Sequence, residues 1–162
     1  MPRQTARAVV VRYFAGEKQL LVMERYRRDE KTGELLHYYS IPGGHIEEGE
    51  TAEEAALREI GEEMNIQVKL EYPLAVVHEK AGAKHIYFAA TYLGGEPHLS
   101  PDSPEALHAT PDNQFIPRWV PVSEAGLRAN LHPVFQKLIP RIAAVANGEK
   151  HNHPWRISEI SL

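Results

Sequence analysis

Three glutamates near the middle of the chain have the spacing of a site for a divalent cation. In the segment 44–66, GHIEEGETAEEAALREIGEEMNI, the pattern predicts a helix from about residue 51 to residue 64. Glu59, Glu62 and Glu63 then stand at i, i+3 and i+4, on one face of that helix. Carboxylates that close repel one another unless a cation lies between them. Mg²⁺ prefers oxygen ligands and is usually shared with substrate phosphates, so the pattern predicts a metal site for a phosphate-bearing substrate.

A solvent-exposed helix with ion pairs along its surface is the alternative interpretation of the same residues. Arg58 stands four residues after Glu54 and four before Glu62, which is a common arrangement on exposed helices. The glycines that come before the helix, in Pro42-Gly43-Gly44 and Gly49-Glu50, favour the metal site because an exposed helix has no need of them.

The segment resembles the signature box of the Nudix hydrolases: a glycine, five residues, a glutamate, seven residues, then Arg-Glu-apolar-x-Glu-Glu-x-Gly-apolar. The matching residues are Gly44, Glu50, Arg58, Glu59, Ile60, Glu62, Glu63 and Ile66. Asn65 departs from the pattern, since the family usually has glycine there. Asparagine is the next best residue for a left-handed position after a helix, so the departure is expected to be tolerated.

The resemblance implies an α+β fold, an α/β/α sandwich around a mixed β-sheet. We expect residues 1–147 to form this Nudix domain and residues 148–162 to form a C-terminal tail, with Trp155 and Ile157 as its docking residues. The activity implied is metal-dependent hydrolysis of a diphosphate linkage in a nucleoside diphosphate derivative, by attack of water on phosphorus.

The family pattern also assigns roles to individual residues. Glu59, Glu62, Glu63 and the Gly43 carbonyl are the expected ligands of Mg²⁺, with Mn²⁺ as the alternative metal. Arg58 and Glu50 are expected to orient those glutamates. The expected substrate contacts are Arg25, Arg27, Tyr39, Gly43, Gly44 and Glu105.

The general base stays open at this stage. Some relatives use a glutamate of the box, which here means Glu59 or Glu63, and others use an acid of a later loop. The loop acids of this chain are Glu96, Asp102, Glu105 and Asp112. Tyr38, Tyr39, Tyr87 and Phe88 have the rings to stack on a base, although aromatic residues of half-buried strands are more often core.

The remaining elements must position these residues. Strands are predicted at 5–14, 20–28, 37–41, 67–80, 84–93 and 115–122. Within the Glu-rich helix, Leu57, Ile60 and Met64 are expected to face the core. Residues 94–113 show no period and are expected to form a loop that covers the site. A short helix from Ser123 to Arg128 and one amphipathic helix from Pro133 to about Asn147 complete the prediction.

Composition excludes several classes of protein. The 162 residues suit one domain with a core, and a formal charge of −4 offers no basic stripe for polymeric nucleic acid. The sequence contains no cysteine, which rules out disulfides and cysteine zinc sites. It shows no apolar leader near Met1 and no run of 18 apolar residues, so we expect a cytoplasmic protein that acts on a small molecule without a membrane, as a monomer or a homodimer.

Two other functions deserve comparison. A Nudix-like isomerase of isoprenyl diphosphates relies on an active-site cysteine in its best-known form, and this chain has none. A non-catalytic sensor of a nucleotide derivative would use the same fold without turnover. Such sensors usually carry a further DNA-binding domain or a degraded box, whereas the acids of this box are intact.

Overall fold

The predicted strands form, and they join into one mixed sheet. The computed structural model describes residues 2–148 and 158–162. In this part of the chain the strands are β1 (Gln4–Phe14), β2 (Glu17–Arg28), β3 (Leu35–Ser40), β4 (Gly43–His45), β5 (Gln67–His78), β6 (Lys84–Gly94), β7 (Asn113–Pro121) and β8 (Ser158–Ser161). The helices are α1 (Ala52–Met64), α2 (Pro104–Leu107), α3 (Glu124–Asn130), the 3₁₀ helix η1 (Pro133–Leu138) and α4 (Ile139–Ala146).

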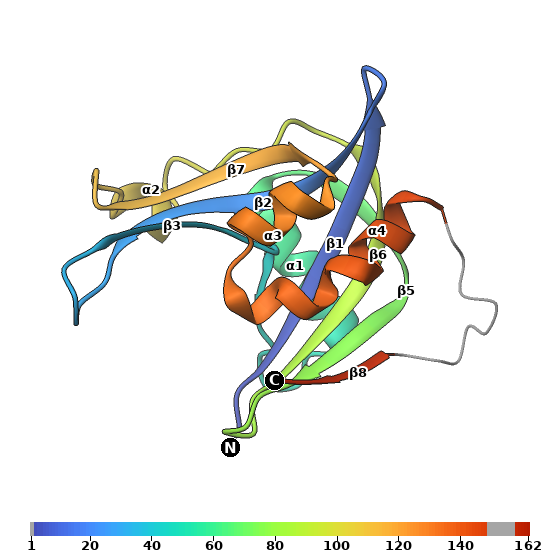
Figure 1. Ribbon diagram of the computed structural model, residues 1–162, viewed down its shortest axis with the longest axis horizontal. Helices are drawn as coiled ribbons and strands as arrows, with labels where there is room; N and C mark the ends of the chain where they lie inside the picture. Colours follow the sequence, from blue (N-terminus) through green and yellow to red (C-terminus); the bar gives the residue numbers. More distant parts are fainter. Residues whose placement is uncertain (1, 149–157) are drawn as a thin grey trace.

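The sheet runs in the order β3-β2-β1-β6-β5-β8, with β4 paired to β1 and β7 paired to β2. β1 and β6 are parallel, as are β5 and β8, and the other pairs are antiparallel. β2, β3 and β7 fan out to one side of β1, whereas β6, β5 and β8 lie on the other side (Figure 1). Because β4 joins only the first residues of β1, the two halves of the sheet diverge where β3 leads into β4.

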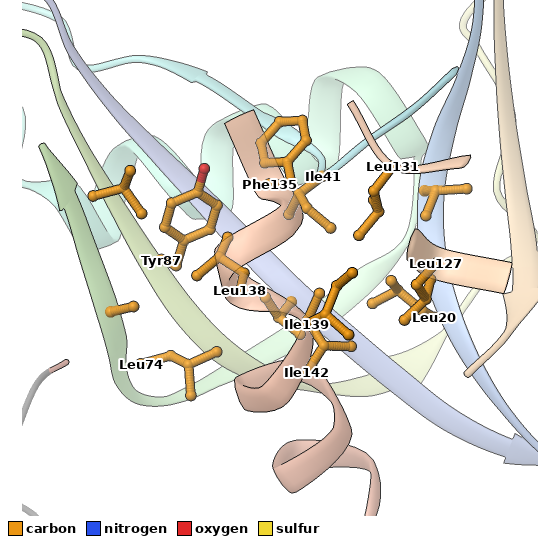
Figure 2. Close-up of a cluster of buried hydrophobic side chains, with 14 of the residues drawn as sticks. Leu20, Ile41, Leu74, Tyr87, Leu127, Leu131, Phe135, Leu138, Ile139 and Ile142 are labelled. Atoms are coloured by element: carbon orange, nitrogen blue, oxygen red, sulfur yellow. The ribbon is translucent and has the colours of Figure 1, made fainter. Parts of the chain in front are cut away.

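Helices cover both faces of this sheet, which gives the α/β/α arrangement expected from the sequence (Figure 1). α1 packs on one face through a cluster that includes Ile60 and Met64. On the other face, α3, η1 and α4 contribute to the largest cluster of buried side chains (Figure 2). That cluster draws on β1, β2, β5 and β6 as well, so residues far apart in the sequence share one core.

α1 begins as its sequence predicts. The Thr51 side chain accepts a hydrogen bond from the Glu54 amide and the Glu54 carboxylate accepts one from the Thr51 amide, which forms a capping box. Ile60 and Met64 are buried as expected, but Leu57 is 45% exposed and the prediction for it was wrong. The buried stripe of the helix runs along positions 56, 60 and 64, and Leu57 is rotated by about 100° from it.

The end of α1 depends on Asn65, which has φ 54° and ψ 35°. This is the left-handed conformation expected at that position. The Asn65 side-chain amide donates to the backbone carbonyl of His98 over 2.7 Å and to the Ser100 hydroxyl over 3.1 Å. The His98 amide in turn donates to the Met64 carbonyl. Asn65 therefore fastens the start of the long connection to the end of α1.

Two predicted segments differ from the structure. Residues 94–113 were expected to form a loop, but they contain the short helix α2, which Ser103 caps. The predicted last helix is divided into η1 and α4, with Pro140 in the first turn of α4. Proline has no N–H to donate to the residue four positions earlier, so an unbroken α-helix across this position would lose a hydrogen bond.

The C-terminal residues 158–161 extend the sheet as β8, which pairs in parallel with β5. Ile160 and Leu162 pack against the largest core cluster. Trp155 and Ile157, the expected docking residues, lie outside the described residues. Nowhere in residues 2–148 and 158–162 is there a helix with the length and apolar character needed to cross a membrane.

Candidate active site

Arg58 is the centre of the charged network on α1. Its Nε donates to one Glu50 oxygen over 2.7 Å and its Nη2 to the other over 3.0 Å. Its Nη1 donates to Glu59 over 2.9 Å and to Glu62 over 3.3 Å. The hydrogen bonds from Arg58 lower the pKa of Glu50 to about 2, and the same bonds raise the pKa of Arg58. Arg58 and Glu50 thus form a fixed ion pair that orients Glu59.

Glu59 lies against the glycines that precede α1. A Cβ atom added to Gly44 would stand 2.5 Å from the carboxyl carbon of Glu59, so only glycine allows this approach. The Glu59 side chain is 15% exposed. Ala55, one turn earlier on the same face, is fully buried. The small residues at both positions leave room for the Glu59 carboxylate next to the backbone of β4.

The carbonyl of Gly43 points away from β1. In the β1–β4 pair, the Ala8 amide donates to the Pro42 carbonyl and the Ile46 amide donates to the Gln4 carbonyl. Hydrogen-bonded and non-bonded pairs alternate along an antiparallel ladder, so the pair between them that joins Arg7 and Gly43 is non-bonded. The Gly43 carbonyl therefore lies outside the ladder, as a metal ligand requires. Residues 43–45 form the short strand β4.

Glu63 is a half-buried acid of the site with a strongly displaced pKa. Burial and the charge of Glu59 raise its pKa to about 8, although the charge of Arg7 acts in the opposite direction. Glu59 also shares a hydrogen bond with Glu63. With this pKa, Glu63 keeps its proton at neutral pH and shares it with Glu59. A cation bound between the two carboxylates would replace that proton.

Glu62 behaves differently from the other two acids of the box. Its side chain is 64% exposed and is paired with Arg58 four residues earlier, the arrangement of an ordinary exposed helix. In the part of the chain that the structure describes, no three acidic or histidine side chains are already gathered as a metal site. Turning the Glu62 side chain away from Arg58 would bring a third carboxylate toward the buried pair.

These residues fit a hard dication. Glu59 and Glu63 are already together, the Gly43 carbonyl lies outside its ladder, and all the donor atoms are oxygens. Gly44 supplies the space in which the Glu59 carboxylate lies.

β2 contributes two arginines to the site, Arg25 and Arg27, which together are called the arginine wall. Arg25 lies on the Phe115 ring, with 3.5 Å between Cζ and the ring centroid, and donates to the Gln114 carbonyl. Arg27 Nε donates to the Tyr38 hydroxyl over 3.2 Å, and Tyr38 also bonds Arg25. Tyr38 stands directly across from Arg25 in the β2–β3 ladder, so their side chains share a face.

Tyr39, the expected substrate contact, lies on the opposite face of β3 from this wall because neighbouring residues of a strand alternate. It packs against the largest core cluster. Tyr38, the preceding residue of the strand, lies on the same face as Arg25 and Arg27.

Glu105 of α2 connects the acidic and basic parts of the site. Burial is the main cause of the raised pKa of Glu63, and the charge of Glu105 contributes to it. It also opposes the fall in the pKa of Arg25 that burial causes. Another acid of the same connection, Asp112, forms an exposed ion pair with Arg28 over 3.1 Å. α2 therefore presents Glu105 to the space between α1 and the arginine wall.

Arg7 is the residue of this region that the sequence analysis missed. Its guanidinium donates to the Ile41 carbonyl over 2.6 Å, and its charge acts on both Glu63 and Glu59. Burial lowers the pKa of Arg7. An arginine between alanines at the start of an otherwise apolar strand was the available signal.

Comparison with known proteins agrees with this geometry. The model of the NUDIX domain family matches residues 2–142 of the chain. The chain belongs to the Nudix hydrolase family. The acids described above are the acids of its Nudix box, and α1 is the Nudix helix.

One relative resembles most of this chain in sequence. The MutT4 protein of Mycobacterium tuberculosis (strain CDC 1551 / Oshkosh) is 29% identical over 127 residues, which cover 74% of this chain. The matched region is 46% of that protein, so this chain spans less than half of its length.

Two solved structures share the fold. The Ap4A hydrolase of C. elegans superimposes with a TM-score of 0.62 and 20% identity, over 89% of this chain and 98% of that one. The ADP-ribose pyrophosphatase of Streptococcus suis superimposes with a TM-score of 0.61 and 14% identity, over 98% of this chain and 99% of that one. At such identities the likeness establishes the Nudix fold and leaves the subgroup open.

Proposed function

We propose that this Nudix protein is a Mg²⁺-dependent pyrophosphohydrolase that cleaves a diphosphate linkage in a nucleoside diphosphate derivative. The observation that carries the proposal is the Glu59–Glu63 pair, two carboxyl groups held together in a mostly buried place on the Nudix helix. A structural role would not require two adjacent acids to be buried, since burial of like charges lowers the free energy of unfolding.

The metal would be held by Glu59, Glu63, the Gly43 carbonyl and, after rotation of its side chain, Glu62. Mn²⁺ could take the same oxygen ligands. When bound, the metal neutralises phosphate oxygens and lowers the pKa of a bound water, which makes that water a nucleophile at neutral pH.

The protein residues have separate tasks in this proposal. Arg58 fixes the orientation of Glu59 through its ion pair with Glu50. Proton transfer from the attacking water falls to Glu63 or Glu105. Glu63 would lose its proton when metal binds, which leaves a carboxylate beside the metal site that can accept a proton from the water. Glu105 is the acid of the α2 connection whose charge acts on Glu63.

The arginine wall is proposed to hold the second half of the substrate. Arg25 and Arg27 have the guanidinium geometry that binds phosphate oxygens, and Tyr38 keeps the two side chains together. The named structural relatives hydrolyse Ap4A and ADP-ribose, which are small nucleotide derivatives. We propose the same general class for this chain. A cytoplasmic location and a homodimer remain predictions from the sequence.

A panel of substrates tests the proposal. The purified protein with Mg²⁺ is incubated with dinucleoside polyphosphates, ADP-ribose, nucleotide sugars and nucleoside triphosphates, and the products are separated by chromatography. Turnover of at least one member, abolished in the Glu59→Gln variant, is expected. Tight binding of a nucleotide derivative without turnover would instead support the non-catalytic sensor and overturn the proposed hydrolase.

A further inference from the structure

We propose that Arg7 is a positioning residue of the metal site, which acts by holding the Gly43 carbonyl in the orientation that a metal needs. The inference rests on the proposed metal site. Arg7 belongs to β1, outside the Nudix box, and its role follows from its contacts with the short connection between β3 and β4.

Arg7 and its neighbour Ala8 hold three consecutive residues, the two of that connection and the first of β4. The Arg7 guanidinium donates to the Ile41 carbonyl over 2.6 Å, and the Ala8 amide donates to the Pro42 carbonyl over 3.0 Å. Gly43 then lies directly across from Arg7 in the β1–β4 ladder. The direction of the Gly43 carbonyl is set by this pairing, because that pair is the non-bonded one.

The contact between Arg7 and Gly43 is close as well as ordered. A Cβ atom added to Gly43 would stand 2.5 Å from Cγ of Arg7 and 2.3 Å from the Ala6 carbonyl oxygen. Gly43 also has φ 154°, and the side chain of Arg7 covers the space beside it. The Arg7 stem thus limits where the Gly43 peptide can move.

Arg7 is also held by η1, which packs on the face of the sheet opposite α1. Its Cζ lies 5.3 Å from the centroid of the Phe135 ring, within the range of a cation–π contact. Phe135 belongs to η1 and is part of the largest core cluster, in which Ile41 and Tyr87 are also buried (Figure 2). The position of Arg7 is therefore determined by the core. Its hydrogen bond to Ile41 then fixes the connection that leads into Gly43.

A positive charge at this place has a second consequence. The charge of Arg7 acts on both Glu63 and Glu59, so it partly balances the acids while no metal is bound. Among the described residues Arg7 forms no ion pair with either acid, and its guanidinium donates to the Ile41 carbonyl. The carboxylates stay available to the metal.

The test uses three variants and Arg12 as the matched control. Arg12 is also on β1, donates one side-chain hydrogen bond, to Gln19, and lies over an aromatic ring, with 4.2 Å from Cζ to the Trp119 centroid. Among the described residues, Arg12 forms no hydrogen bond, ion pair or ring contact with residues 41–44. The variants are Arg7→Met, Arg7→Lys and Arg12→Met, and Mn²⁺ affinity is measured without substrate by electron paramagnetic resonance. Hydrogen exchange of the amides in 43–46 is measured on the same samples.

The expected result separates positioning from general stability. Arg7→Met should weaken Mn²⁺ binding about 10-fold or more, the size usual for residues behind a metal ligand, and should speed amide exchange in 43–46. Arg7→Lys should fall between Arg7→Met and the wild type, because lysine can reach the Ile41 carbonyl but lacks the planar group that lies on Phe135. Saturating Mn²⁺ should restore most of the turnover of both variants. Arg12→Met should bind Mn²⁺ like the wild type.

Each other outcome counts against the inference. Equal Mn²⁺ affinity and exchange in Arg7→Met and Arg12→Met would overturn it while leaving the proposed hydrolase intact. If Arg7→Met does not fold, wild-type affinity and exchange in Arg7→Lys would overturn it. A wild-type protein that binds no Mn²⁺ would overturn the proposed metal site, and the role of Arg7 with it.

Discussion

Glu59 and Glu63 are the side chains on which the proposed chemistry depends most directly. Glutamine has the same shape as glutamate but no charge, so Glu59→Gln and Glu63→Gln remove a metal ligand without removing side-chain volume. Each substitution should lower kcat by about 100-fold or more, a loss of several kcal/mol of transition-state stabilisation. Steady-state kinetics at saturating Mg²⁺ measure the effect, with Glu53→Gln in the first turn of α1 as the control. Near-normal rates in both variants would favour the exposed-helix interpretation of the box.

The pH dependence of stability gives a second test of Glu63. Its pKa is about 8 in the folded chain, compared with an ordinary value of 4.5, because burial and Glu59 disfavour the charged form. Between these values the unfolded chain loses the proton and the folded chain keeps it. Without metal, the free energy of unfolding should therefore fall as pH rises through that window and level off above it.

Denaturant titrations in chelator at the two ends of the window measure this fall. In Glu63→Gln the contribution disappears, so the variant should be more stable than the wild type at the upper end and similar at the lower end. A wild-type protein whose stability changes with pH in the same way as that of Glu63→Gln would show that Glu63 titrates normally.

Asn65 combines a backbone requirement with a side-chain requirement. Valine strongly resists the observed φ of 54°, so Asn65→Val should lower the free energy of unfolding by about 2 kcal/mol. Glycine accepts that φ but loses the bonds to His98 and Ser100, so Asn65→Gly should cost about 1 kcal/mol. Thermal and denaturant unfolding compare the two. A larger loss in the glycine variant would show that the side-chain bonds outweigh the backbone conformation.

At the scale of elements, the connection from β6 to β7 has two parts with different roles. Residues 94–100 are anchored, since Asn65 bonds His98 and Ser100 and Leu99 packs against the α1 cluster. The part that carries α2 presents Glu105 toward Glu63 and Arg25. We expect the second part to select substrates and the first part to support the fold.

Replacement of residues 102–110 by a short Gly-Ser segment tests this division. The relative rates across the substrate panel should change, while the Mg²⁺ requirement and the melting temperature stay close to the wild type. A comparable replacement within 95–100 should lower the melting temperature. If the α2 replacement leaves the substrate profile unchanged, α2 is an inert connection.

For the whole molecule, the prediction concerns divalent metal. Excess chelator should abolish turnover, Mg²⁺ should restore it, and Ca²⁺ should bind with poor turnover because its coordination is larger and looser. Mg²⁺ should also raise the melting temperature, because binding to the folded state alone stabilises that state. Hydrolysis that persists in excess chelator would contradict the metal assignment, and calorimetry without a metal-dependent shift would contradict binding.

The sequence by itself determined the local features of the site. The start of α1 near Thr51, the left-handed Asn65 and the strands β1 and β2 depend on residues close together in the chain, so pattern and propensity were enough to predict them. The spacing of Glu59 and Glu63 is likewise set by the helix. The match of the box to the Nudix pattern then supplied the fold.

Tertiary structure alone decided which of these residues are buried and what they contact. Glu63 is half-buried while Glu62 stays exposed, although both belong to the same helix turn. Tyr38, and not Tyr39, joins the arginine wall because the β2–β3 register sets its face. Arg7 reaches Ile41 across 34 positions of sequence. Burial and register arise from contacts between distant segments, and their free energy depends on the packed core, which no local pattern encodes.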